Sequence, residues 1–277
     1  MKNAALLIVF VLALNLPLNG LVAQESAEKH PLLESTFSVG LGAFVFDKEI
    51  QLKVNGQDTG DDIDFDERWD VLSDENSFSG VFRWRFGEKW SLWGQYFQSD
   101  DSATAILEED VTWQDLTFKA GTNVGAGVEL DVARIFVGRV FSAGPRHEFG
   151  LGAGLHWLEL GAYLEGEVIV NDETTGFQRA AVGAEAPLPN IGGWYDYAFS
   201  PKWLARARLD WFYASIGDYE GSLYNGSLGI QYQAFDHVGF GLAYQMFGLD
   251  LDVSKDSWNG SVDLLYHGPF LSVTANW

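Results

Sequence analysis

Polar and apolar residues alternate with a period of two along most of the chain beyond residue 34. The segment Phe270–Trp277 shows the pattern most regularly, with apolar residues on one face and Ser272, Thr274 and Asn276 on the other. A period of two is that of a β-strand with one apolar face. Because a chain end is usually polar and frayed, so regular a final strand predicts a sheet that closes on itself.

Ten such strands are predicted, and they are joined by two kinds of connection. The strands span residues 35–46, 76–87, 89–99, 123–142, 146–162, 188–199, 202–216, 221–234, 237–251 and 257–277. Four connections are tight turns, whereas those at 47–76, 100–122 and 163–186 are long, polar and acidic. Alternating short and long loops are typical of an antiparallel membrane barrel. We therefore expect an all-β, closed transmembrane barrel of about ten strands, with eight or twelve as alternatives and both ends in the periplasm.

The polarity of the two faces distinguishes two kinds of barrel. In the strand at 202–216, Trp203 and Trp211 share one face, and Arg206, Arg208 and Asp210 share the other. A soluble sandwich or a lipocalin-like barrel also alternates, but turns its apolar face inward. Strands of ten or more residues with Trp or Tyr near their ends match a tilted membrane crossing bounded by aromatic girdles. We therefore expect the apolar face to meet lipid and the charged face to line the lumen.

Two strands change the phase of their alternation partway along. In the last strand, apolar residues occupy even positions up to Tyr266 and odd positions from Leu271 onward. This predicts a β-bulge at His267-Gly268-Pro269, because Gly relaxes the backbone and Pro cannot donate a ladder hydrogen bond. In the fourth strand, Arg134 falls on the apolar parity, which predicts a second bulge near Ala133.

The N-terminal residues have the features of a secretory signal peptide. Lys2 precedes an apolar run from Ala4 to Leu14, and Leu21-Val22-Ala23 offers a cleavage site. A transmembrane helix is the alternative, but polar residues from Asn15 onward end the run short of the roughly 20 residues that a spanning helix needs. We predict a signal peptide at 1–23, a short periplasmic tail at 24–34 and a barrel at 35–277.

Composition narrows the functional classes. The formal net charge of -22 argues against nucleic-acid binding and against direct docking on anionic lipid. The absence of Cys excludes a lipid-anchored N-terminus, a disulfide framework, and Cys-based catalysis or zinc binding. The 11 Trp residues suit amphipathic belts at a membrane interface.

The strands, the turns and the final aromatic residue resemble the outer-membrane β-barrel proteins of Gram-negative bacteria, broadly the OmpA-like and OmpW-like barrels. The resemblance covers residue 35 to the end. It implies a location in the cell outer membrane and a terminal assembly signal for the barrel assembly machinery and periplasmic chaperones, but no particular activity. That signal comprises Leu271, Val273, Ala275 and Trp277, with Trp in place of the more usual Phe. The acidic segment at 61–66 leading into 82–86 is similar to a pattern in loosely characterised members.

Charged residues on the predicted inward face form the main candidate site. They are Arg83, Arg85, Glu148, His156, Asp196, Arg206, Arg208 and Asp210. They could select solutes by charge in a channel, or pair with one another and plug a barrel of about ten strands. We expect the plug, with the glycines at 150, 152 and 154 leaving room for the arginines opposite.

A second candidate is the acidic run Asp62, Asp64 and Asp66, which alternates like the start of a calcium loop. Glu67 stands where an EF-hand needs Gly, and Ser73 stands where it needs Glu, so that motif fails. A looser divalent-cation loop and a solvated acidic loop both remain, and we expect the solvated loop and no cofactor or resident metal. Partners would be outer-membrane lipids and lipopolysaccharide, bridged by Mg²⁺ or Ca²⁺.

Catalysis would need a His beside carboxylates, or a Ser, at the outer rim of the barrel. Ten-stranded outer-membrane barrels include the omptin proteases, and smaller ones act on lipid A. His156 with Glu159, or His267, are the candidates, and neither lies in a recognised motif. We therefore predict a monomeric, non-enzymatic barrel with a structural or surface-interaction role. A narrow porin-like channel is the first alternative, and an outer-membrane enzyme acting on lipid or peptide is the second.

Overall fold

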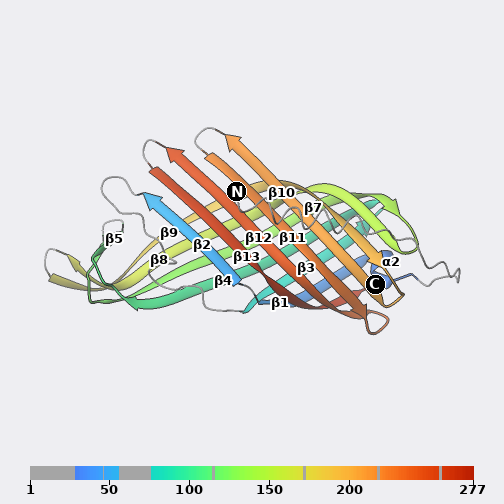
Figure 1. The fold of residues 1–277 in the computed structure, drawn as a ribbon, viewed down its shortest axis with the longest axis horizontal. Coiled ribbons are helices and arrows are strands. Elements are labelled where there is room, and N and C mark those ends of the chain that lie inside the picture. Colours follow the sequence, from blue (N-terminus) through green and yellow to red (C-terminus); the bar gives the residue numbers. More distant parts are fainter. Residues whose placement is uncertain are drawn as a thin grey trace.

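Long tilted strands form a closed antiparallel barrel in the computed structural model of the protein (Figure 1). The structure describes residues 29–45, 47–55, 76–113, 116–170, 173–216, 219–255 and 258–277. The predicted signal peptide at 1–23 and the acidic run Asp62, Asp64 and Asp66 lie outside these residues. Within the described ranges, no helix combines the length and the apolar character of a membrane-spanning segment.

The strand order follows the chain around the barrel, and closure occurs where β1 pairs with β13. The strands of the wall are β1 (Phe37–Val45), β2 (Asp47–Asn55), β3 (Asn76–Phe86), β4 (Trp90–Ile106), β7 (Asn123–Ala143), β8 (His147–Val170), β9 (Glu173–Ala198), β10 (Trp203–Ile216), β11 (Tyr219–Gln233), β12 (Val238–Lys255) and β13 (Trp258–Asn276). β1 and β2 pair with successive parts of β13 and together form one position in the wall. The barrel therefore has ten strands, as predicted.

The short connections all lie at one end of the barrel. They are the turns at 87–89, 144–146, 199–202 and 234–237, and the first needs Gly87 because its φ of 61° is in the left-handed region. The C-terminus and the short helix α2 (Pro31–Glu34) lie at the same end (Figure 1). A small hairpin of β5 (Val111–Trp113) and β6 (Leu116–Phe118) pairs with β8 toward the opposite end.

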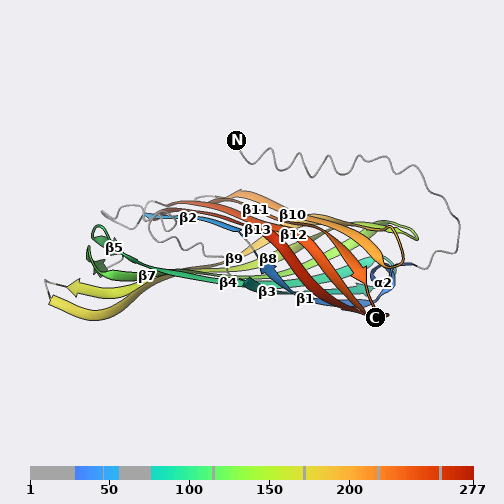
Figure 2. The same cartoon turned by 60° about the horizontal axis from the view of Figure 1, so that its bottom comes forward.

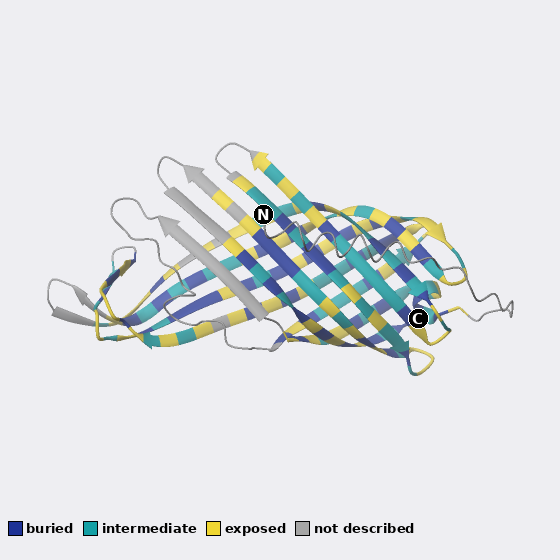
Figure 3. Cartoon of the chain, in the orientation of Figure 1, coloured by how far each residue is buried: buried dark blue, intermediate teal, exposed yellow. Residues whose placement is uncertain are grey.

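Outward-facing residues form an apolar band that follows the short-turn end. Burial alternates along the strands (Figure 3), and β8 turns Phe149, Leu151, Leu155 and Trp157 outward before Glu159. The nine residues from 149 to 157 cover roughly 23 Å at about 3.3 Å per residue and a tilt of about 40°. This height matches the ~25 Å apolar band of outer-membrane barrels.

The barrel wall continues well beyond that band. The segment 163–186 was expected to be a loop, but most of it belongs to the paired strands β8 and β9 (Figure 2). At the same rise and tilt, residues 158–170 of β8 alone add roughly 33 Å of height along the barrel axis. The sequence pattern hid these strands because their outward face carries charged residues such as Glu159, Glu165 and Arg179, as a loop would.

The barrel interior changes character along its axis. Charged side chains fill it near the short turns, and an apolar cluster fills it farther out. Nine members of that cluster are Phe97, Val128, Leu130, Leu164, Leu223, Phe247, Leu264, Tyr266 and Phe270. The wall beyond the apolar band, here called the upper wall, thus packs around an apolar core, as in a soluble barrel. The lower wall, which carries the band and ends at the short turns, has its apolar face on the outside.

The exchange of polarity between the two faces explains the phase changes from which two bulges were predicted, and both predictions are wrong. β12 and β13 pair without a shift past His267, Gly268 and Pro269, and β4 and β7 pair without a shift past Ala133. Even-numbered residues of β13 point inward from Leu264 to Asn276. The prediction was wrong because the polarity of the two faces exchanges while the backbone parity is unchanged. The register shift in the β7–β8 pair lies between Val140 and Ser142, next to the turn.

Candidate functional site

Three arginines share two buried carboxylates at the short-turn end of the lumen. Glu148 accepts hydrogen bonds from Arg83 and Arg85, with Arg85 Nη2 at 2.8 Å from Oε2. Asp196 accepts from Nε and Nη2 of Arg206, both at 2.7 Å. Arg83 Nη1 lies 3.6 Å from the same carboxylate, so it connects the two pairs. The strand register sets this geometry, because Glu148 faces Asp196 across β8–β9 and Asp196 faces Arg206 across β9–β10.

A second ion-pair group lies deeper in the lumen. Asp210 has no exposed surface and accepts from Arg134 Nη2, at 2.9 Å from Oδ1 and 2.8 Å from Oδ2. Arg208 Nε lies 3.3 Å from Oδ2 of the same residue. One carboxylate therefore serves two guanidinium groups, and Arg134 comes from β7 on another part of the wall.

Aromatic rings connect the two ion-pair groups. The guanidinium carbons of Arg83, Arg206 and Arg208 lie 4.5, 5.2 and 4.8 Å from the ring centre of Trp93. Such cation–π contacts stabilise a cation in a site with little water. Trp194 packs 5.8 Å from Trp93, centre to centre, and donates its Nε1–H to Glu148 at 2.7 Å. The lumen site is therefore an interlocked set of arginines, carboxylates and indoles.

The inward glycines make room for Trp194 and for neighbouring strands. A Cβ on Gly150 would lie 2.2 Å from Cζ2 of Trp194, and one on Gly138 would lie 2.4 Å from its Cζ3. A Cβ on Gly152 or Gly154 would instead meet backbone oxygens of β7. The expectation that glycines 150, 152 and 154 leave room for the arginines is therefore wrong. Gly150 makes room for the Trp194 ring, and Gly152 and Gly154 allow β7 and β8 to approach each other closely.

Helix α2 closes the lumen at the short-turn end. Its Leu32 is buried against Ala198 and Leu204. The carbonyl oxygen of Leu32 accepts from Arg85 Nη2 at 3.0 Å, and that of Ser35 accepts from Arg85 Nη1 at 3.2 Å. The part of the predicted tail that the structure describes is thus a short helix bound to the arginine group.

The N-cap of α2 is a titratable residue. The ring of His30 accepts the Leu32 N–H at its Nδ1, at 3.2 Å, and its side chain is fully buried. Burial and, secondly, the charge of Arg206 lower the pKa of His30 from 6.5 to about 4. When α2 is docked, its N-cap imidazole is therefore neutral.

The two histidines considered for catalysis lie on opposite faces of the barrel wall. His156 points inward, is fully buried and meets Asn225 Nδ2 at 3.2 Å through its Nε2, whereas Glu159 points outward. The two therefore occupy opposite faces of β8. His267 lies on the outer face, where its Nδ1 is 2.7 Å from the hydroxyl of Tyr244.

All eight residues of the predicted charge set lie in the lumen, but sequence reasoning missed three of their partners. Arg134 was set aside because of the wrongly predicted bulge, although its even position in β7 points inward. Trp93 and Trp194 occupy inward-facing positions of their strands, and the alternation along each strand would have identified them.

The predicted assembly signal forms the strand that closes the barrel. Leu271 and Val273 point outward and are about half exposed. Trp277 stacks on Phe37 with ring centres 6.1 Å apart, and the two residues exchange backbone hydrogen bonds of 2.9 and 3.0 Å. The last residue thus pairs with the start of β1, and its role as a signal stays a prediction.

Comparison with known proteins identifies the fold. No protein-family model matches the chain, and no curated protein sequence matches it. The structure is similar to that of the outer-membrane protease OmpT from Escherichia coli, with a TM-score of 0.57 and 8% identity over 92% of this chain and 100% of that one.

Two weaker structural likenesses are to proteins with other roles. They are the translocator domain of the autotransporter NalP from Neisseria meningitidis (TM-score 0.44, 9% identity, 87% of each chain) and the toluene transporter TodX of P. putida (TM-score 0.36, 9% identity, 90% of this chain and 92% of that one). At such identities a likeness concerns the fold alone. The chain has the fold of outer-membrane β-barrel proteins, as the sequence resemblance implied.

Proposed function

We propose that the chain is a monomeric β-barrel of the cell outer membrane with a closed lumen and a structural or surface-interaction role. The observation that carries this proposal is the filling of the lumen in successive layers. These layers are helix α2, the arginine–carboxylate–Trp set and the apolar cluster around Phe247. The apolar outward band with its aromatic residues supports the location.

The acidic outer face of the upper wall supports a surface role. Asp131, Glu159 and Glu185 lie directly opposite one another across β7, β8 and β9, just beyond the apolar band. Like charges at directly opposed positions destabilise a sheet. A row that weakens the fold is better explained by an interaction outside it.

Cation-bridged lipopolysaccharide is the partner that this row best fits. Among the described residues, no three acidic or histidine side chains are arranged to hold a metal ion by themselves. We therefore infer that Mg²⁺ or Ca²⁺ would be shared between these carboxylates and lipid phosphates, which are hard oxygen ligands of the kind these ions prefer.

Conductance in planar bilayers tests the closed lumen. The purified barrel is expected to give no discrete openings at either polarity, since these three layers of described residues fill the lumen one after another. A refolded barrel of similar size, engineered to have an open lumen, serves as the positive control, because its openings show that refolded protein inserts into the bilayer. Discrete, charge-selective openings that change in Arg206→Ala would refute closure.

Cation dependence tests the surface role. In bilayers containing lipopolysaccharide, Mg²⁺ is expected to raise the thermal midpoint of the barrel, and a chelator should reverse the rise. The triple variant Asp131→Asn, Glu159→Gln, Glu185→Gln should lose this response, and its midpoint in chelator should be unchanged or slightly higher, because the like charges are gone. An unchanged response in the triple variant would count against the row as the contact.

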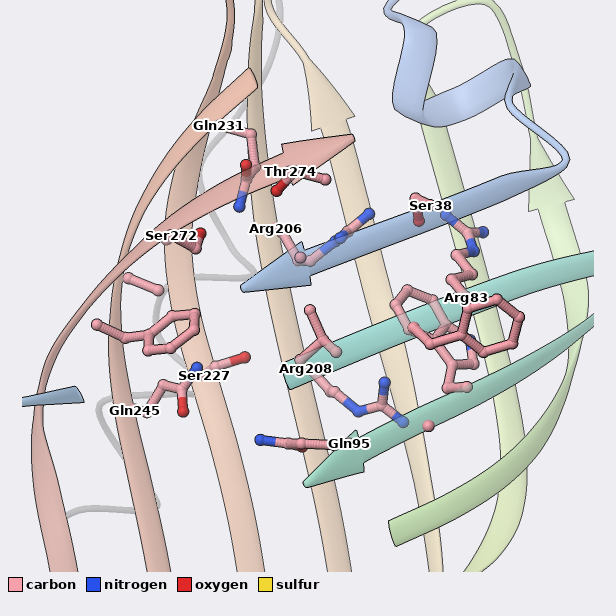
Figure 4. A pocket seen from close by; sticks show the side chains of 18 of the residues that line it. Ser38, Arg83, Gln95, Arg206, Arg208, Ser227, Gln231, Gln245, Ser272 and Thr274 are labelled. Carbon is pink, nitrogen blue, oxygen red and sulfur yellow. The ribbon is translucent and has the colours of Figure 1, made fainter. Parts of the chain in front are cut away.

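A narrow channel is the second candidate, because a cavity of about 100 Å³ interrupts the filling of the lumen. It is lined on one side by Arg83, Arg206 and Arg208 (Figure 4). A channel of this kind would be anion-selective, and the conductance experiment distinguishes it from the plug.

A further inference from the structure

The lumen cavity has two chemically different walls. One presents the guanidinium groups of Arg83, Arg134, Arg206 and Arg208. The other carries no charged side chain among its described residues and presents neutral polar and apolar groups, mainly from β11, β12 and β13 (Figure 4). These neutral residues include Ser227, Gln231, Gln245, Ser272 and Thr274. Among the described residues that line the cavity, none is an Asp or a Glu.

The buried charges around the cavity do not balance. Five arginines pair with three carboxylates, so two positive charges are left in excess. The carboxylates are Glu148, Asp196 and Asp210, and they lie behind the arginines rather than on the cavity wall. Buried cations without a full set of partners are costly, so the site favours an additional negative charge.

Several donors of these arginines are free to meet such a charge. Nη1 of Arg134 and Nη2 of Arg208 are buried and have no hydrogen-bond partner within the described part of the chain. The side chains of Arg206 and Arg208 keep 20% and 12% of their surface accessible although they lie inside the barrel. A planar guanidinium presents paired donors that suit the oxygens of a carboxylate or phosphate.

We propose that this cavity binds one small anion, an oxyanion or carboxylate held by Arg134, Arg208 and the neutral wall. A cavity volume of about 10–15 Å³ holds one water, so 100 Å³ has room for one such anion with a few waters. The proposal goes beyond the closed-lumen role and holds for a plug or a channel.

Substitution of Ser227 gives a sharp test of the site. Ser227 lies directly opposite Arg208 in the β10–β11 register, at a spacing of about 5 Å between Cβ atoms. Ser227→Asp therefore supplies a fixed carboxylate where the bound anion would sit. The matched control is Thr104→Asp, which adds the same charge at an exposed, outward-facing position of β4.

Isothermal titration calorimetry on the full-length barrel in detergent measures the binding. The probes are inorganic phosphate, sulfate and acetate, each at constant ionic strength made up with sodium chloride, whose anion lacks the paired oxygens of the proposed ligand. We expect one saturable site per barrel for at least one probe. Ser227→Asp should lower its affinity at least tenfold, and Thr104→Asp should change it less than twofold.

Folding of each variant is checked by the heat-modifiable mobility of the barrel, and Arg208→Gln provides a second loss-of-binding variant. Absence of saturable heat with all three probes in the unsubstituted barrel would overturn the proposal. So would an affinity in folded Ser227→Asp or Arg208→Gln equal to that of Thr104→Asp, since it would place the anion elsewhere on the molecule.

Discussion

Asp210→Asn removes the one carboxylate that pairs with both Arg134 and Arg208. The three groups are almost completely enclosed, with 0% of the Asp210 side chain and 1% of the Arg134 side chain exposed. Removing one partner from a buried ion pair costs about 3–5 kcal/mol, because the remaining charge is left without compensation. The amide is nearly isosteric with the carboxylate, so the loss isolates charge from packing.

Urea unfolding in lipid vesicles, followed by tryptophan fluorescence, measures this loss. With a slope of about 3 kcal/mol per molar urea, a loss of 3–5 kcal/mol lowers the midpoint by about 1–1.7 M. Asp250→Asn is the control, because Asp250 is exposed and lies directly opposite Asp263 on β13. Removing one of two like charges should leave the midpoint unchanged or raise it slightly.

The double variant Asp210→Asn with Ser227→Asp separates charge from local strain. It gives Arg208 a new carboxylate across the β10–β11 pair, so part of the lost stability should return. A loss of stability below about 1 kcal/mol in Asp210→Asn, or a stability change equal to that in Asp250→Asn, would refute the view that Asp210 compensates the buried charges of Arg134 and Arg208.

Four further predictions concern other parts of the barrel. Gly150→Ala should lower stability by about 1–3 kcal/mol in the same urea assay, because its Cβ would collide with Trp194, whereas Gly80→Ala, whose Cβ meets only Leu41 Cδ2 at 3.7 Å, should be nearly neutral. Docking of α2 should be constant above pH 6.5 and weaken as pH falls toward about 4, because the undocked His30 takes up a proton that the docked one excludes. Iodide quenching of a fluorophore at Glu34→Cys should report this change, and His30→Asn, which keeps a capping side chain, should abolish it. Because the chain has no Cys, single replacements at Leu265 and His267 should react with a maleimide and those at Leu264 and Tyr266 should not; the reverse result would restore the bulge. Trp277→Ala should reduce the amount of assembled barrel in the outer membrane and Trp277→Phe should not, if the terminal aromatic is an assembly signal.

The sequence predicted the number of strands, the short turns and the inward charged set because a lipid-facing wall forces strict alternation. It failed where that constraint ends. Alternation reports which face is apolar, and it does not report which face points inward. Glu129 and Asp131 in β7, like Leu264 and Tyr266 in β13, lie beyond the apolar band, where the apolar face turns to the lumen. The phase change therefore imitated a bulge.

The partners in the site were beyond reach for a related reason. Parity places Arg206 and Asp196 on the inner face, but it cannot tell which residue of a distant strand lies across the lumen. The pairing of Arg134 on β7 with Asp210 on β10 depends on the diameter and tilt of the closed barrel. The seat of Trp194 on Gly138 and Gly150 likewise needs three strands to be placed together.

The exchange of polarity partway along each strand also fixes how far the strand is inserted. In a uniformly alternating strand, a slip of two residues keeps every side chain on its proper face and costs only the end pairs. Here the same slip would move Glu159 down into the lipid or bring Leu264 into the arginine layer. The inversion height thus acts as an axial marker, and it makes the depth of each strand as strongly specified as its facing.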